Sequence, residues 1–102
     1  MLKVQNIKDL KSLKEDINVF KLFSDNTIEL IHLTLQPNDK IKLHKNSLDV
    51  VFYVLEGEGE LIVENEERHI KKGSCVEVKK NLDRSWENIS NLQLCLMAIK
   101  RK

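Results

Sequence analysis

The sequence predicts an all-β protein, built as an antiparallel sandwich or barrel. Apolar residues recur at every second position in several short segments, which is the period of a β-strand. Turn-forming residues separate these segments, for example Ser24-Asp25-Asn26 and Pro37-Asn38-Asp39. Apolar residues at helical spacing occur once, near the start of the chain. Short strands at such regular spacing are typical of antiparallel architectures.

The expected elements follow the chain in order. Ile7, Leu10 and Leu13 recur at helical spacing after Asn6, a helix-capping residue type, and predict a short N-terminal helix. Six strands are then predicted at residues 27–36, 40–44, 50–55, 60–64, 75–78 and 92–99. Segment 40–44 alternates strictly, whereas segment 50–55 is apolar at every position. We therefore expect a single domain over residues 1–102, with an accessory N-terminal segment (1–16) and a β-barrel (17–102).

Composition excludes several classes of partner. The chain has 17 Lys+Arg and 16 Asp+Glu residues, a net charge of +1, whereas a nucleic-acid-binding domain usually gathers a basic excess on one face. No segment approaches the roughly 20 apolar residues that span a membrane, and the start lacks the apolar run of a signal peptide. We expect a cytoplasmic protein without nucleic-acid or membrane partners, in which Cys75 and Cys95 are free thiols.

Residues 37–88 carry a resemblance to a known family. The phrase Val51-Phe52-Tyr53-Val54-Leu55-Glu56-Gly57-Glu58-Gly59-Glu60 is similar to the central hairpin of the small single-domain cupins. The first cupin motif, G-x5-H-x-H-x3-E-x6-G, falls on Asn38, His44, Asn46, Val50 and Gly57. The second motif, G-x5-P-x-G-x2-H-x3-N, falls on Gly73, Lys79, Asn81, Arg84 and Asn88. The resemblance implies an antiparallel double-stranded β-helix, or jelly-roll barrel, with a left-handed turn at Asn38.

The resemblance also indicates where this chain departs from the family. Cupins usually hold a metal with three His and one Glu, and here those positions hold His44, Asn46, Val50 and Arg84. Neither Val nor Arg supplies a lone pair to a cation, and Arg adds positive charge. We therefore expect no metal and no other cofactor. A bulge that turns Asp49 inward, or a metal site built from other residues, stays an alternative.

Strand parity and the resemblance together predict a ligand pocket. If His44 faces the interior, so do Lys42, Asn46, and the apolar floor of Val50, Phe52 and Val54. Arg84, Trp86 and Asn88 share the inward face. The candidate ligand-binding residues are His44, Asn46, Phe52, Arg84, Trp86 and Asn88. A guanidinium beside an imidazole suits a carboxylate or phosphate ligand.

Structural roles compete with this interpretation. Arg84 could pair at the rim with Glu56 or Glu58, Trp86 could serve packing, and Asn88 could hold a turn through backbone hydrogen bonds. His44 could be structural as well.

Two functions remain open. The chain is either a small-molecule-binding cupin-like barrel for an anionic ligand, or a metal-independent or atypical-metal enzyme, such as an isomerase of a sugar-like or carbonyl substrate, with His44 as acid or base. Whether it is an enzyme stays undecided, because the cupin fold serves both roles. No second titratable partner for His44 is evident in the sequence.

A homodimer is also expected. If Val50, Phe52 and Val54 line the barrel, then Val51, Tyr53 and Leu55 point outward, where a solvated sheet should be polar. The N-terminal segment around Val4, Ile7 and Leu10, or a second subunit, must cover them. We expect a homodimer through the sheet that bears Tyr53 and Leu55.

Overall fold

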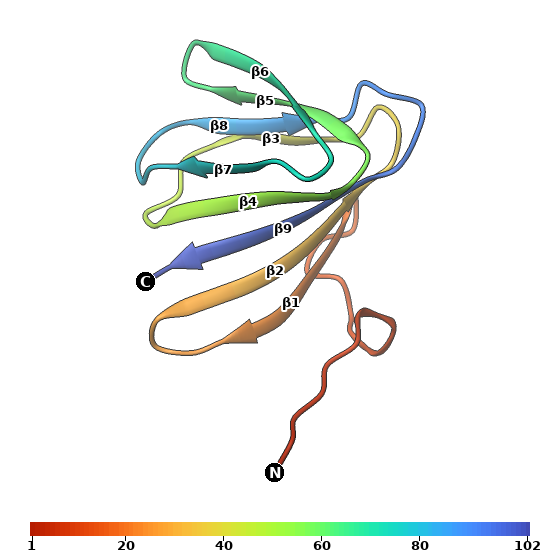
Figure 1. Cartoon of the computed structure of the whole chain (residues 1–102), viewed down its shortest axis with the longest axis vertical. Coiled ribbons are helices and arrows are strands. Elements are labelled where there is room, and N and C mark those ends of the chain that lie inside the picture. The colour runs from red at the N-terminus through yellow and green to blue at the C-terminus, as the bar shows by residue number, and fades with distance from the viewer.

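The computed structural model describes all 102 residues and consists almost wholly of β-strands (Figure 1). One short 3-10 helix, η1, precedes the strands at Ile7–Asp9. The strands are β1 (Asn18–Ser24), β2 (Ile28–Leu35), β3 (Lys40–His44), β4 (Asp49–Glu56), β5 (Glu58–Val63), β6 (Glu66–Lys71), β7 (Cys75–Val78), β8 (Arg84–Glu87) and β9 (Leu94–Arg101). No helix is long and apolar enough to cross a membrane.

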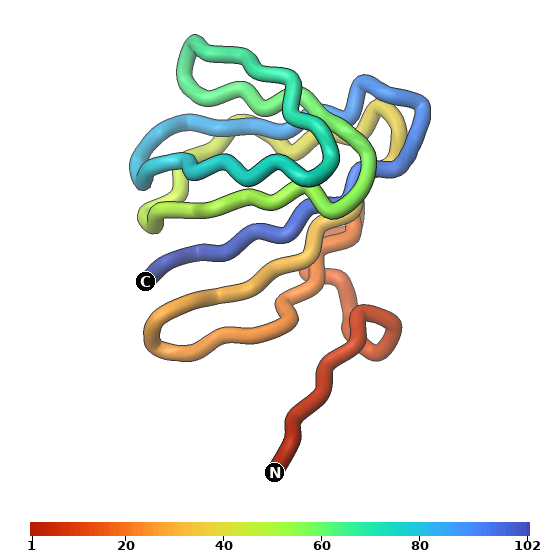
Figure 2. Tube along the Cα trace, viewed as in Figure 1, coloured from red at the N-terminus to blue at the C-terminus, as the bar shows by residue number.

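The strands form two sheets that face each other, a five-stranded sheet (β1-β2-β9-β4-β7) and a four-stranded sheet (β3-β8-β5-β6). All pairings within them are antiparallel. The last strand, β9, lies between β2 and β4, so the two ends of the strand sequence are interleaved in one sheet (Figure 2). This is the jelly-roll arrangement that the resemblance implies.

Alternation along the strands places one face of each sheet in the core. Val50, Phe52 and Val54 of β4 are buried, as parity predicts, and they face Trp86 and Leu61 of the opposite sheet within one hydrophobic cluster. Phe52 and Trp86 meet edge to face, with ring centroids 5.5 Å apart. The core therefore lies between the sheets.

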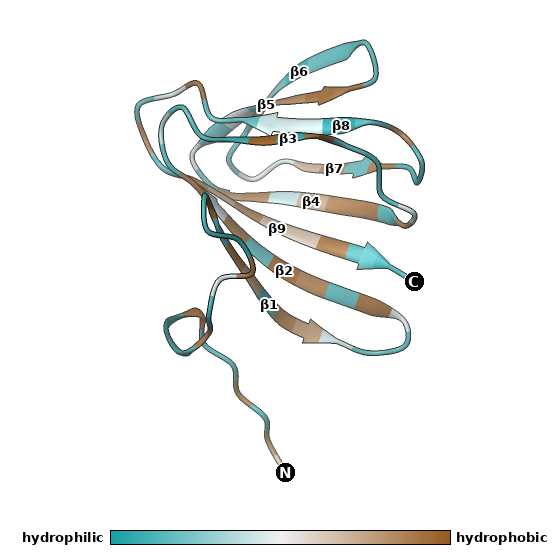
Figure 3. Cartoon of the chain, turned by 180° about the vertical axis from the view of Figure 1, so that it is seen from behind, coloured by the Kyte–Doolittle hydropathy of each residue, from teal (hydrophilic) through white to brown (hydrophobic).

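The sequence does not predict three of the observed strands, β1, β6 and β8. β6 (sequence EERHIK) is charged along almost its whole length and appears hydrophilic in Figure 3. Such a composition suits an edge strand, and it has no apolar alternation to detect. β8 has only four residues, and β1 has a register shift between Lys21 and Phe23 that breaks its alternation. The predicted N-terminal helix is wrong in extent, since only the single turn η1 forms after Asn6.

Two turns use asparagine where the cupin motifs have glycine. Asn38 and Asn81 have φ angles of 72° and 66°, in the left-handed region that Asn tolerates better than most residues. The expected left-handed turn at Asn38 is thus confirmed. The turn at Asn81 matters for the site, because it places backbone carbonyls next to Arg84.

The outer face of the five-stranded sheet carries two rows that are mostly apolar. One row crosses all five strands through Phe20, His32, Met97, Tyr53 and Cys75. The next row contains Phe23, Leu30, Ile99 and Val51. Leu55 falls within the register shift between Val54 and Glu56, so Glu56 takes the outward place opposite Cys95. Val51 and Tyr53 do face outward.

Candidate functional site

A cavity of about 130 Å³ lies between the two sheets. Nine of its fourteen lining residues are hydrophobic, among them Val50, Phe52 and Trp86. The polar lining consists of Lys14, His44, Asn46, Arg84 and Lys100. The lining contains no Asp or Glu, so every ionisable side chain in it is basic.

Arg84 enters the cavity from the first position of β8, opposite His44 of β3. Only 1% of its surface is exposed. Nε donates to Leu82 O at 2.9 Å and Nη2 donates to Lys79 O at 2.8 Å, so the guanidinium is fixed on the turn around Asn81. Nη1 takes part in no hydrogen bond of the chain, and no ion pair includes Arg84. The expected alternative of a rim pair with Glu56 or Glu58 is therefore wrong.

Burial without a carboxylate partner has an electrostatic consequence. Desolvation is the main influence on this guanidinium and lowers the pKa of Arg84 from its ordinary value, while the nearby Asp83 carboxylate acts in the opposite direction. Arginine nevertheless stays protonated at neutral pH. The site therefore presents a fixed positive charge to the cavity.

His44 reaches the cavity because β3 contains a bulge. Ile41 pairs with Trp86 and His44 pairs with Arg84, so three steps on β3 match two on β8. The extra residue returns His44 to the face of Ile41, where it lines the cavity while remaining exposed; Lys42 is exposed and lies outside the lining. The prediction that Lys42 faces inward is thus wrong, because simple alternation does not hold across a bulge.

A hydrogen bond sets the tautomer of His44. Its Nδ1 lies 2.8 Å from Lys42 O, and since a carbonyl only accepts, Nδ1 carries the proton. Nε2 is then the atom that can accept a proton or, once protonated, donate a hydrogen bond to a ligand.

Trp86 forms a wall of the cavity and is 1% exposed. Its indole Nε1 is buried and has no hydrogen-bond partner. Buried indole N–H groups normally find an acceptor. Trp86 thus holds a buried donor that no atom of the chain satisfies.

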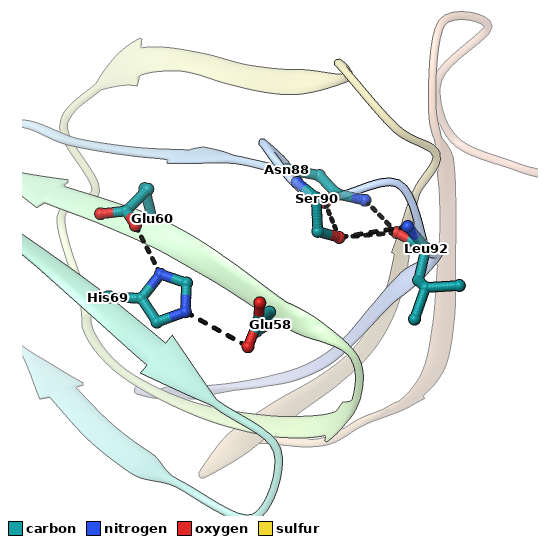
Figure 4. Close-up of polar contacts among 6 residues, drawn as sticks. All are labelled: Glu58, Glu60, His69, Asn88, Ser90 and Leu92. Carbon is teal, nitrogen blue, oxygen red and sulfur yellow. Dashed lines mark hydrogen bonds and ion pairs between the residues drawn. The ribbon is translucent and has the colours of Figure 1, made fainter.

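Asn88 lies outside the cavity. It is fully buried, and its amide nitrogen donates to Leu35 O at 3.0 Å. The same nitrogen donates to Leu92 O at 2.8 Å, and the amide oxygen accepts from Ser90 (Figure 4). These contacts hold the turn after β8. Val54, expected in the cavity floor, is buried but does not line it either.

The four positions that correspond to the cupin metal ligands do meet at this cavity, since His44, Asn46, Val50 and Arg84 all line it. Their chemistry does not fit a divalent cation. Asn46 Oδ1 already accepts from Leu48 N at 3.0 Å, Val50 has no donor atom, and Arg84 is positive. Asp49 does not turn inward, because its Oδ1 accepts from Lys80 N at 2.8 Å. Nowhere in the chain do three or more His, Cys, Asp or Glu side chains gather as potential metal ligands.

Two basic lining residues are absent from the sequence prediction. Lys100 follows Leu94, Leu96 and Ala98 at alternate positions of β9, so parity could have placed it inward had the strand been extended past residue 99. Lys14 comes from the loop before β1, and no periodicity indicates where a loop residue points.

Comparison with known proteins supports the fold. The family model described as "Cupin domain" matches residues 31–100. Among solved structures, TT1209 of Thermus thermophilus superposes with a TM-score of 0.83 at 22% identity, covering 98% of this chain and 97% of that one. An RmlC-like cupin family protein of Methanocaldococcus jannaschii gives a TM-score of 0.80 at 22% identity, with 91% and 86% covered.

A third solved structure carries a functional name. The polyketide cyclase RemF of Streptomyces resistomycificus gives a TM-score of 0.85 at 15% identity, covering 99% of this chain and 80% of that one. At these identities the similarities show the fold alone. Comparison with curated protein sequences gives no match.

Proposed function

Because the chain belongs to the cupin family, we propose that it uses the cavity between its sheets to bind a small organic anion without a metal. The observation that carries this proposal is Arg84, a buried guanidinium that lines the cavity and has no carboxylate partner. A buried charge without a counter-charge is costly, and a carboxylate or phosphate in the cavity would supply one.

The surrounding groups support an anion with an apolar body. Arg84 Nη1 is a donor that no atom of the chain satisfies, and His44 Nε2 is a further polar atom without a partner in the chain. The remaining wall is mostly apolar. A cavity of about 130 Å³ is close to the roughly 150 Å³ of engineered cavities that hold benzene. Short-chain and monocyclic carboxylates are the matching sizes.

Ligand-induced thermal stabilisation tests the proposal. A ligand that binds only the folded state at about 100 times its Kd adds about 2.7 kcal/mol, which is several degrees in Tm for a chain of this size. We expect butyrate or benzoate to raise the Tm of the wild type and of Arg68→Gln, whose arginine is exposed beside Glu66. We expect no shift for Arg84→Gln.

A second variant is needed because Arg84→Gln removes two hydrogen bonds to the turn and could lose binding through misfolding alone. Ala98→Val adds volume to the cavity wall without touching Arg84, and it should weaken binding too. A wild type that responds to no carboxylate or phosphate at millimolar concentration contradicts the proposal. So does a stoichiometric metal that is lost on His44→Ala.

A metal-independent enzyme is the second candidate function, and the tautomer of His44 favours it. With Nδ1–H engaged by Lys42 O, Nε2 can act as a base toward a substrate whose carbonyl Arg84 polarises. The probe is pyruvate in D₂O, with loss of its methyl proton signal followed by NMR. Exchange that requires His44, and stops in His44→Gln while carboxylate binding persists, supports an enzyme. Exchange no faster than in buffer supports a binding protein.

We also propose a homodimer through the outer face of the five-stranded sheet. The apolar rows through Tyr53 and Val51 support it, with Tyr53 40% and Phe23 50% exposed. The first residues of the N-terminal segment offer no cover, since Val4 is 86% exposed and the start of the chain runs away from the sheets (Figure 2). Light scattering should give twice the 11.9 kDa monomer mass. Met97→Glu should give the monomer, and the same mass for both proteins contradicts this interface.

The cytoplasmic location stays a prediction. The free thiols support it, because Cys75 is exposed and Cys95 is buried, with no disulfide in the chain.

A further inference from the structure

The cavity carries more positive charge than one carboxylate can balance. Three permanently basic residues line it: Lys14 from the loop before β1, Arg84 from β8 and Lys100 from β9. None of the three takes part in an ion pair, although Lys21, Lys40 and Lys79 on the surface do. From this charge distribution we infer that the ligand is a small organic dianion, a dicarboxylate or a phosphate monoester.

Lys100 faces the cavity from near the end of β9. It stands level with Val50 of β4 and Glu29 of β2 in the strand register. Glu29 could have neutralised it, but the Glu29 carboxylate pairs with Lys21 at 3.2 Å. The charge of Lys100 is therefore available to a molecule in the cavity.

Lys14 is held at the cavity by a structured loop. Ser12 Oγ lies 2.7 Å from Lys14 O and 3.1 Å from Ile17 O, and it accepts from Val19 N at 3.0 Å. Leu13 N also donates to Val19 O at 2.8 Å. These contacts tie the loop to the start of β1, where Ile17 is buried and lines the same cavity. The last residues of the N-terminal segment, from Ser12 on, are thus part of the site.

The inference rests on the proposed function and specifies its ligand. Arg84, the buried cation, holds one anionic group, and Lys14 and Lys100, which are more accessible to solvent, meet the other. In a mostly apolar cavity that is partly shielded from water, a second opposite charge adds more affinity than at an open surface. The small volume limits the chain between the two anionic groups to a few carbon atoms.

Calorimetric titration with matched pairs of probes tests the inference. The pairs are succinate with butyrate, glutarate with valerate, and phenyl phosphate with benzoate. The first two pairs test a second carboxylate as the source of the second charge, and the third pair tests a phosphate monoester. We expect the better dianion to bind about tenfold or more tightly than its monoanionic partner. In the double variant Lys14→Gln/Lys100→Gln, the ratio of dianion affinity to monoanion affinity should fall to about one. Lys42→Gln, which removes an exposed lysine outside the cavity, should keep the wild-type ratio.

The outcomes separate the inference from the proposed function. If monoanions and dianions bind the wild type equally, or if the double variant keeps the preference, the inference is wrong and anion binding stands. If no anion binds the wild type, both the inference and the proposed function are wrong. If the double variant does not fold, the single variants Lys14→Gln and Lys100→Gln must each lower the ratio, and an unchanged ratio in both overturns the inference.

Discussion

Replacement of Asn88 by alanine separates a structural role from a ligand-binding role at a position that the cupin motif singles out. Asn88 is fully buried at the end of β8. Its amide nitrogen donates to Leu35 O. It also donates to Leu92 O, and the amide oxygen accepts from both the backbone N–H and the hydroxyl of Ser90 (Figure 4). The Asn88→Ala variant loses all four contacts at once.

The expected cost follows from which partners can recover. Ser90 is only partly buried, so water can replace its two bonds at small cost. Leu35 is fully buried, so its carbonyl, which also lies next to the core, loses a partner that water cannot easily replace. An unsatisfied buried group costs about 1–3 kcal/mol, and a lost ordinary hydrogen bond about 1 kcal/mol. We expect Asn88→Ala to lower the free energy of unfolding by about 2–4 kcal/mol.

Urea denaturation measures this loss, with Asn91→Ala as the matched control. Asn91 lies three residues on, is exposed, and its side chain makes no hydrogen bond within the chain, so its replacement should cost less than about 0.5 kcal/mol. Carboxylate affinity, measured well below the unfolding transition, should be unchanged in both variants. A loss under 1 kcal/mol for Asn88→Ala, or a weakened ligand in a stable variant, would refute the structural role.

Two further predictions concern backbone and charge. Gly57 and Gly73 both have positive φ, but an alanine Cβ at Gly57 would lie 2.3 Å from Gln93 O, while at Gly73 it would meet nothing within 4 Å. By urea denaturation, Gly73→Ala should cost about 1–2 kcal/mol and Gly57→Ala more than about 3, and equal losses would contradict this. Glu60 and Glu58 flank His69 (Figure 4) and raise its pKa above 6.5, mainly through hydrogen bonds. This contribution to stability is fully present below pH 6.5 and is lost as the pH rises through the folded-state pKa, by less than about 1 kcal/mol because His69 is exposed. His69→Gln should remove that pH dependence, and the same pH profile in both proteins would exclude it.

The sequence alone was sufficient for the fold class and for most of the core. Strands rich in apolar residues, such as β2 and β4, were predicted within one or two residues of their observed bounds. Strands β1, β6 and β8 were not predicted. β1 has a register shift, β6 is almost wholly charged, and β8 has only four residues. Strand pairing in the sheet stabilises them, and pairing leaves no trace in the composition of a single segment.

The sequence likewise predicted some residues of the candidate site correctly and others wrongly. Parity and the family motifs were sufficient to bring His44, Asn46, Phe52, Arg84 and Trp86 to one cavity. They failed at Lys42, because a bulge changes the facing of every residue on one side of it. They also assigned Asn88 to the ligand, although its hydrogen bonds belong to a turn.

What the sequence determined about this protein is local: the period of its strands, its turns, and the residues that stand at the cupin motif positions. What only the tertiary structure decided is the balance of charge around the cavity. Arg84 lies buried without an acid because its turn supplies carbonyls instead of a carboxylate. Lys14 joins it through a loop that Ser12 ties to β1. The charge of Lys100 has no counter-charge from the chain, because Glu29, its neighbour in the sheet, pairs with Lys21. The physical reason is that electrostatic neutralisation depends on distances across strands and loops, which no spacing along the chain encodes.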